Sequence, residues 1–201
     1  PASARSESPR ATVWAAAFAA RDGSPVLALK DVRPVAALDV THGVAIGDAA
    51  RAIRDGYLDI AIAGGAEAPI IASAVGVFQG TRAMSAPDPE DVARSCKPFA
   101  KNRSGLVLGE GAAFLVLESA ERAHARGARC YGYLSGYGVS NDAHHIGMPA
   151  TEGQVRALRA ALADASLQPA DIAYVNAHAT ATDGGDVIES AALREVFGAG
   201  A

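Results

Sequence analysis

The sequence is poor in cysteine, in aromatic residues and in basic charge. Its two cysteines, Cys96 and Cys130, lie in no C-x-x-C pair and beside no histidine cluster, which argues against a zinc site and a disulfide framework. There are 18 lysines and arginines against 22 aspartates and glutamates, so the sequence lacks the basic stripe of a nucleic-acid-binding protein. Aromatics make up 5% of the residues, which favours close backbone packing over a core of large rings.

Long apolar runs are also missing from the sequence. None reaches the roughly 20 residues that a membrane-spanning helix needs. We therefore expect a cytoplasmic protein, and its few cysteines fit a reducing compartment. The largely apolar stretch ATVWAAAFAA lies between Arg10 and Arg21, and the core of a signal peptide is an alternative interpretation of it.

Alternating strand-like and helix-like stretches predict an α/β fold, with helices layered on a parallel or mixed sheet. The expected helices are 43–56, 70–80, 119–127, 151–167 (with Thr151 as its N-cap) and 184–198. The expected strands are 59–69, two runs within 106–119 around a Gly-Glu-Gly corner, the start of 129–142, and 172–178. Residues 1–38 give no clear pattern.

The stretch YVNAHATATDGGD, residues 174–186, contains the strongest candidate for a functional side chain. His178 follows an expected strand and precedes a loop of threonine and glycine residues. Ligands of open α/β sheets bind at the carboxyl ends of strands, where a histidine can transfer a proton or donate a hydrogen bond while neutral. A structural histidine that is hydrogen-bonded to the backbone is the alternative interpretation.

The remaining histidines and Cys130 are weaker candidates. His144 and His145 are adjacent, and adjacent residues of an extended chain point to opposite faces, which argues against a shared metal ion. We expect this pair to be solvated and His124 to lie on the surface. Cys130 lies in an apolar run and is expected to be a buried small side chain. We expect no metal site.

Four stretches of the sequence carry a family resemblance: DIAIAGGAEAP, CKPFAKNRSGLVLGEGAAFLVLES, SNDAHHIGMP and YVNAHATATDGGDVIES. In this order they resemble the β-ketoacyl-[acyl-carrier-protein] synthases, the elongating condensing enzymes of bacterial fatty acid and type II polyketide synthesis. The resemblance covers residues 41–198. It implies a thiolase-like α-β-α-β-α layered fold, incomplete in this chain. Residues 39–127 would end the ketosynthase N-terminal half and 128–201 would begin the C-terminal half, whereas 1–38 do not resemble the family.

The resemblance also implies an acyltransferase reaction, a decarboxylative Claisen condensation. An active-site cysteine takes an acyl group as a thioester, malonyl-carrier protein loses CO₂, and the resulting carbanion attacks the thioester. The implied partners are acyl carrier protein, its acyl and malonyl thioesters, and a second subunit in a homodimer or heterodimer. No nucleic acid or cofactor is implied, because the phosphopantetheine arm belongs to the carrier protein.

The resemblance assigns roles to several residues. His178 matches the histidine that stabilises the developing enolate oxygen, and Thr180 and Thr182 match hydroxyl residues that contact the phosphopantetheine arm. Three further positions match supporting residues of the family: Glu110, the buried acid of the Gly-Glu-Gly corner; Asp186, the acid after the threonine loop; and His145, in the vicinity of the active site.

The sequence departs from the family where the nucleophile is expected. Counting back without a gap from Gly47 puts Asp39 at the cysteine position, and aligning on Gly43 with a one-residue deletion puts Val40 there. Neither side chain can form a thioester. The family's second histidine and its lysine follow the first histidine, and neither residue type occurs between His178 and Ala201.

These departures leave three interpretations open. In the first, the chain is a β-ketoacyl synthase that is inactive in isolation. In the second, it is a non-catalytic subunit of the chain-length-factor type, or a gene fragment, that binds a partner or carrier protein. The third is a thiolase-fold enzyme that uses His178 for other chemistry. A local change also matters, because Ala179 stands where the family usually has glycine and adds a Cβ in a tight turn.

Overall fold

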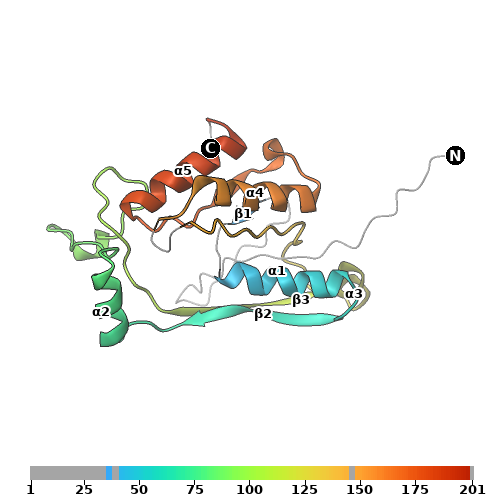
Figure 1. Cartoon of the computed structure of the whole chain (residues 1–201). Coiled ribbons are helices and arrows are strands. Elements are labelled where there is room, and N and C mark those ends of the chain that lie inside the picture. The colour runs from blue at the N-terminus through green and yellow to red at the C-terminus, as the bar shows by residue number, and fades with distance from the viewer. Residues whose placement is uncertain (1–34, 38–40, 145–147, 200–201) are drawn as a thin grey trace.

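The computed structural model describes residues 35–37, 41–144 and 148–199 and shows an α/β fold (Figure 1). Its elements are β1 (Val35–Ala37), α1 (Thr41–Arg54), β2 (Ile60–Glu67), α2 (Ala72–Gly80), η1 (Val92–Arg94), β3 (Gly111–Glu118), α3 (Ala120–Ala125), α4 (Thr151–Ala165), η2 (Pro169–Asp171), β4 (Tyr174–Asn176) and α5 (Asp183–Phe197). All five expected helices are confirmed. The stretch 11–20 lies outside the described residues.

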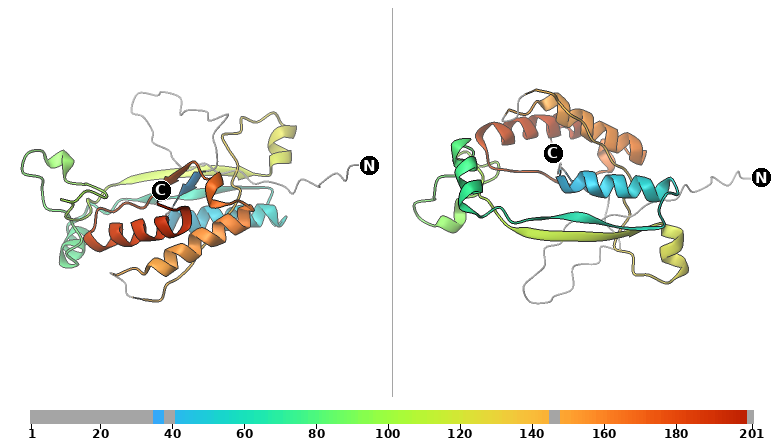
Figure 2. Two further views of the ribbon diagram at one scale, coloured as in Figure 1. Left: turned by 90° about the horizontal axis from the view of Figure 1, so that it is seen from above. Right: turned by 60° about the horizontal axis from the view of Figure 1, so that its bottom comes forward.

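Strands β2 and β3 form an antiparallel ribbon that α1 covers on one face (Figure 2). Alternate residues of a strand point to opposite faces. Ala63 and Leu117 accordingly face α1 and form a buried cluster with Ile46 and Ile53. On the other face Ile62 is 72% exposed. The ribbon is therefore apolar on both faces, although α1 covers only one.

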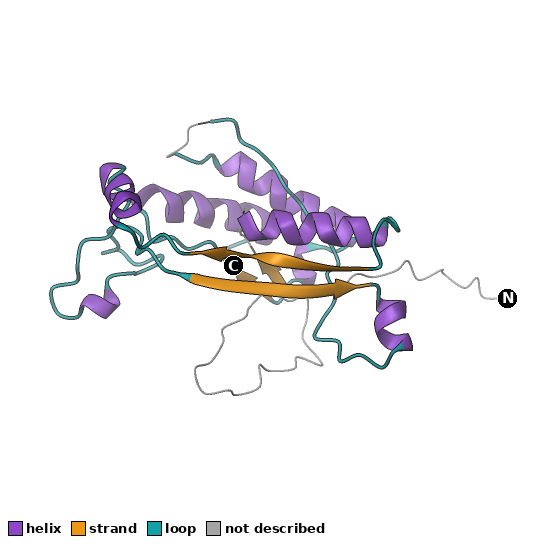
Figure 3. Ribbon diagram, turned by 90° about the horizontal axis from the view of Figure 1, so that it is seen from below, coloured by secondary structure: helices purple, strands orange, loops and turns teal. Residues whose placement is uncertain are grey.

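Helices α4 and α5 pack together through a second apolar cluster. Their buried residues recur three or four positions apart, as expected for helices with one apolar face: Val155, Leu158 and Leu162 on α4, and Ala192 and Val196 on α5. In Figure 1, α1 lies between the β2–β3 ribbon and this helix pair, and Figure 3 shows the helices and the ribbon from below. No helix in the described part of the chain is long and apolar enough to cross a membrane.

The expected N-cap of α4 is wrong by one residue. Ala150 occupies the N-cap position without a capping side chain, and Thr151 is the first helical residue. The Asp142 carboxylate instead accepts the Ala150 N–H at 2.8 Å, and so a side chain of the preceding loop fixes the start of the helix. The N–H groups of Ala150 and His144 lower the pKa of Asp142.

Strands β1 and β4 are parallel, with Ala37 opposite Asn176 at their carboxyl ends. Helix α1 begins at Thr41, soon after β1, and His178 follows β4 by two residues. Residues that follow adjacent parallel strands leave the sheet at the same edge. The strand register therefore places Ala37, the last residue of β1, at the same edge as the His178 loop.

The strand expected at the start of 129–142 is wrong, since residues 129–140 form no strand. This segment instead runs between two helices. A Cβ on Gly136 or Gly138 would overlap the backbone of α4, and a Cβ on Gly47 of α1 would overlap the ring of Tyr137. The alternation of small and large residues in this segment therefore reflects packing between helices and not strand pairing.

Two further expectations about strands and burial are wrong. The first of the two strand-like runs within 106–119 forms no strand and contributes only an isolated bridge between Met84 and Leu106. The second run forms β3, which starts at Gly111. Cys130 is exposed, not buried, since it lies in the segment without a strand. His124 is on the surface as expected, and its Nε2 is 3.1 Å from the Tyr133 hydroxyl.

We expect the Gly138→Ala substitution to destabilise the fold by about 1–3 kcal/mol, because its methyl group would overpack against the α4 backbone. The Gly76→Ala substitution in α2 is the matched control, since a Cβ there would meet no atom within 4 Å. We expect it to be neutral or to stabilise by up to about 1 kcal/mol through helix propensity. Urea unfolding measures both changes, and equal effects would contradict the close packing of Gly138.

Candidate functional site

The backbone of the His178 loop is held by a buried carboxylate of α5. Glu189 is 3% exposed. Its Oε1 accepts the His178 N–H at 2.7 Å, and its Oε2 accepts the Ala179 N–H at 2.9 Å. Hydrogen bonds to an ionised acceptor are stronger than neutral ones. Glu189 therefore fixes the direction in which the chain leaves β4.

A second buried carboxylate lies one helical turn earlier on α5. Asp186 is 2% exposed. Its Oδ1 accepts the Ala181 N–H at 3.0 Å, and its Oδ2 accepts the Phe99 N–H at 2.6 Å. Arg103 lies 3.6 Å from the same Oδ2 atom and supplies the opposite charge that a buried acid needs. Asp186 thereby joins the His178 loop to a segment more than 80 residues earlier.

The guanidinium of Arg103 completes this connection. Its Nε donates to the Thr182 carbonyl at 3.2 Å and its Nη2 to the Asp183 carbonyl at 2.6 Å, while its Nη1 donates to the Ala100 carbonyl at 3.1 Å. Arginine can do this because its planar group presents five donors in a fixed arrangement. The FAKNRSG and HATATD motifs therefore form one structural unit.

The loop before Phe99 is ordered by Asp88. Its carboxylate accepts the N–H groups of Glu90 and Asp91 at 3.0 and 2.9 Å, and it pairs with Lys97. The hydrogen bond from Lys97 contributes most to holding the pKa of Asp88 at about 2. The carboxylate is therefore ionised at neutral pH and fixes the chain two residues before Phe99.

The side chains of the His178 loop remain open to a ligand. His178 is exposed, and the structure records no hydrogen bond of its imidazole to the described residues. The hydroxyl oxygens of Thr180 and Thr182 lie 3.0 Å apart and are half-buried. A Cβ on Gly185 would overlap the Thr182 hydroxyl, so the glycine leaves room for this pair.

Two alanines of this loop adopt left-handed backbone conformations. Ala179 has φ of 52° and Ala181 has φ of 63°. This region costs a residue with a Cβ roughly 1–2 kcal/mol. The N–H groups of both alanines bind the buried carboxylates, and these bonds offset the strain.

Several residues singled out in the sequence lie elsewhere. Glu110 is exposed, which corrects the expectation of a buried acid, and its Oε1 accepts the Ile70 N–H at 3.1 Å. It precedes β3 at an end of the ribbon where neither apolar cluster of the described residues lies. Asp39, Val40 and His145 lie outside the described residues.

His144 is solvent-exposed, as expected, and its Nδ1 lies 2.9 Å from the Met148 carbonyl. The described residues contain no group of three or more histidine, cysteine, aspartate or glutamate side chains that could hold a metal ion.

Sequence reasoning missed Glu189 and Arg103. A signal for Glu189 was present, because it lies three residues after Asp186 and three before the buried Ala192. Residues with these spacings share one face of a helix. An acid on the apolar face of a helix indicates a buried carboxylate with a specific partner. No comparable signal marked Arg103.

Comparisons with known proteins identify the group to which this site belongs. Residues 41–123 match the family model of the β-ketoacyl synthase N-terminal domain, and residues 131–201 match that of the C-terminal domain. The chain belongs to the β-ketoacyl synthase family. It is 46% identical over 156 residues to 3-oxoacyl-[acyl-carrier-protein] synthase 2 of Staphylococcus aureus, an alignment that covers 77% of this chain and 38% of the relative.

Solved structures agree with this assignment. A type II PKS ketosynthase in complex with its acyl-carrier protein (AntDE:AntF) matches with a TM-score of 0.75 and 37% identity, over 79% of this chain and 39% of that one. The ishigamide ketosynthase/chain length factor matches with a TM-score of 0.72 and 41% identity, over 78% and 37%. The expected thiolase-like fold, incomplete in this chain, is confirmed. The chain spans about two fifths of the length of these relatives.

We expect the Glu189→Ala substitution to cost about 1–3 kcal/mol for each of the two backbone N–H groups that lose their acceptor. Glu195→Ala on the same helix is the control, because Glu195 is exposed and forms a surface ion pair worth less than about 1 kcal/mol. Urea unfolding compares the two variants. If Glu189→Ala lowered the free energy of unfolding no more than Glu195→Ala does, the hydrogen bonds of Glu189 to the His178 loop would contribute nothing to stability.

We expect the Ala179→Gly substitution to stabilise the chain by up to about 1 kcal/mol, because glycine adopts positive φ without steric cost but loses more entropy on folding. Ala191→Gly, at an exposed position of α5, should instead destabilise by about 1 kcal/mol. Thermal unfolding of both variants measures the difference. Destabilisation by Ala179→Gly would rule out strain at this position.

Proposed function

We propose that this chain carries the His178 half of a β-ketoacyl synthase site, which binds a malonyl thioester on the phosphopantetheine arm of acyl carrier protein. The observation that carries this proposal is the exposed imidazole of His178 on a loop whose backbone is fixed by Glu189. The backbone of His178 is thus held in place, and its ring is free to contact a substrate. The relatives of this chain by sequence and structure are ketosynthases.

His178 would act on the oxygen of the malonyl thioester. When the carboxylate leaves as CO₂, the electron pair of the broken C–C bond moves onto the α-carbon and the thioester oxygen. A ring N–H of His178 donates to that oxygen and stabilises its negative charge. The half-buried hydroxyls of Thr180 and Thr182 would contact the pantetheine arm.

The acyl-transfer step lacks its nucleophile in this sequence. Strand β1 ends at the sheet edge from which the His178 loop starts, and the three residues that follow β1 in the sequence are Leu-Asp-Val. An acyl group on Asp39 would be a mixed anhydride, which water hydrolyses, and Val40 has no nucleophilic atom. We therefore infer that this chain binds the malonyl substrate without condensing it.

A second candidate function is that of a non-catalytic ketosynthase-like subunit. The absence of cysteine at Asp39 and Val40 favours it, as does the match to a ketosynthase/chain length factor structure. Such a subunit would form a cytoplasmic heterodimer with a ketosynthase that has its own cysteine. Carrier protein would be the shared partner.

We expect the purified chain to form no 3-oxoacyl product from acyl-carrier and malonyl-carrier protein, because acyl transfer needs a nucleophile. Malonyl-pantetheine should nevertheless shift the NMR resonances of the His178 ring. The His178→Ala substitution should abolish this binding when it is measured by isothermal titration calorimetry, whereas His124→Ala, at an exposed position of α3, should preserve it.

Formation of a 3-oxoacyl product would contradict the inferred lack of condensation. The absence of any shift at His178 at saturating malonyl-pantetheine would contradict the assigned site. If the chain restores chain-length control to a cysteine-bearing ketosynthase in the same assay, the second candidate function is favoured over the first.

A further inference from the structure

The two apolar clusters of the molecule share no buried residue. One joins α1 to the β2–β3 ribbon, and the other joins α4 to α5. Glu189 attaches the His178 loop to α5, whereas the chain that precedes α1 holds the expected nucleophile position. The His178 loop and α1 therefore depend on different clusters, and the contacts between these clusters decide how the loop and α1 face each other.

One carboxylate near the end of α4 contacts both α1 and the segment that contains Tyr137. The Nη1 of Arg54, the last residue of α1, donates to Oδ1 and Oδ2 of Asp164 at 3.0 and 3.2 Å. The Oδ2 atom also accepts the Tyr137 N–H at 2.9 Å. Asp164 thereby joins α4 to α1 and to the segment that runs between the two helices.

Tyr137 contacts α1 with its ring. The absence of a Cβ on Gly47 leaves space for the ring, and the Arg51 guanidinium lies 4.8 Å from the ring centroid, within the range of a cation–π contact. Gly136 and Gly138, on either side of Tyr137, press against the backbone of α4. Burial is the main cause that raises the pKa of the Tyr137 hydroxyl.

We propose that Asp164 is a positioning residue that, through Arg54 and Tyr137, sets the orientation of α1 relative to the His178 loop. Together the three residues form an interhelical joint. The importance of this joint for the active site rests on the proposed function. The geometry of the joint does not, and it can be measured without any substrate.

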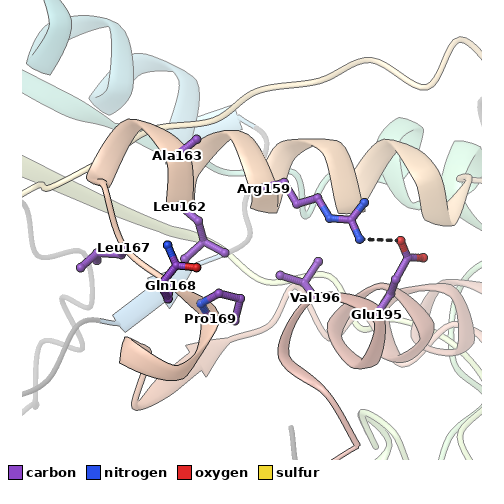
Figure 4. Close-up of a pocket in the computed structure, with 8 residues that line it drawn as sticks. All are labelled: Arg159, Leu162, Ala163, Leu167, Gln168, Pro169, Glu195 and Val196. Carbon is purple, nitrogen blue, oxygen red and sulfur yellow. Dashed lines mark hydrogen bonds and ion pairs between the residues drawn. The ribbon is translucent and has the colours of Figure 1, made fainter.

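A second ion pair on α4 differs from the Arg54–Asp164 pair in the elements that it connects. Arg159 and Glu195 also lie 3.0 Å apart and span α4 and α5 at the edge of a groove of about 400 Å³ (Figure 4). These two helices already share the apolar contacts of Leu162 and Val196, and so this pair adds no connection between the two clusters. It provides a control on the same helix with the same kind of interaction.

The experiment measures the distance between α1 and α5 with spin labels. Cys96 and Cys130 are replaced by serine, and labels are attached at Ala45→Cys on α1 and Ala191→Cys on α5, which are both exposed positions. We expect Asp164→Ala to shift and broaden the distance distribution. Asp164→Asn should have a smaller effect, because its amide oxygen still accepts the Tyr137 N–H. Arg54→Met should have an effect similar to that of Asp164→Asn. Arg159→Met and Glu195→Gln should leave the distribution unchanged.

Unchanged distributions in Asp164→Asn and Arg54→Met would show that the ion pair does not position α1. An unchanged distribution in Asp164→Ala would overturn the joint altogether. Gly47→Ala provides a second route if Asp164→Ala does not fold, since its methyl group displaces the Tyr137 ring and should shift α1 in the same assay; no shift would likewise overturn the joint. Either negative result would leave the malonyl-pantetheine binding test unaffected, so failure of the joint and failure of the proposed function are distinguishable.

Discussion

The carboxylates of Asp186 and Glu189 are the constraint on which the functional loop depends. Both are almost fully buried on successive turns of α5, where an unpaired charge would be costly. The cost is offset because backbone N–H groups of His178, Ala179 and Ala181 are aimed at them. The loop in turn holds two alanines in left-handed conformations only because these bonds exist. Neither the buried acids nor the strained loop would be stable without the other.

Helices α1 and α4 were predictable from the sequence because their apolar residues recur at helical spacing, and a glycine follows or ends the expected stretches of α1, α2, α3 and α5. The segment 129–140 was not predictable, since alternation of small and large side chains is the same for a paired strand and for an extended segment between helices. Tyr137 and its flanking glycines satisfy that pattern by packing on α1 and α4. The expected burial of Glu110 and Cys130 was wrong for a related reason. A local motif fixes the backbone, but which elements cover a side chain is decided by distant parts of the chain.

The candidate site was predictable in part. His178, Thr180 and Thr182 stood out because they follow a strand in a pattern that the condensing enzymes share. Glu189 and Arg103 did not, although they hold the loop in place, because a single acid or arginine on a helix or loop is most often solvated. Sequence patterns show the groups that we propose to contact a ligand more readily than those that hold the backbone of the loop. The latter are recognisable only when the segments they join are seen together.

The way in which the loop is fixed bears on the alternative that His178 is structural. A structural histidine is expected to use its ring nitrogens to satisfy nearby backbone groups. Here the backbone of residues 178 and 179 is satisfied by Glu189, and no hydrogen bond to the imidazole is recorded among the described residues. The fold therefore places the burden of local structure on a carboxylate, which leaves both ring nitrogens available to a ligand. This division of roles favours a functional histidine, and it explains why the site has two buried acids next to an exposed ring.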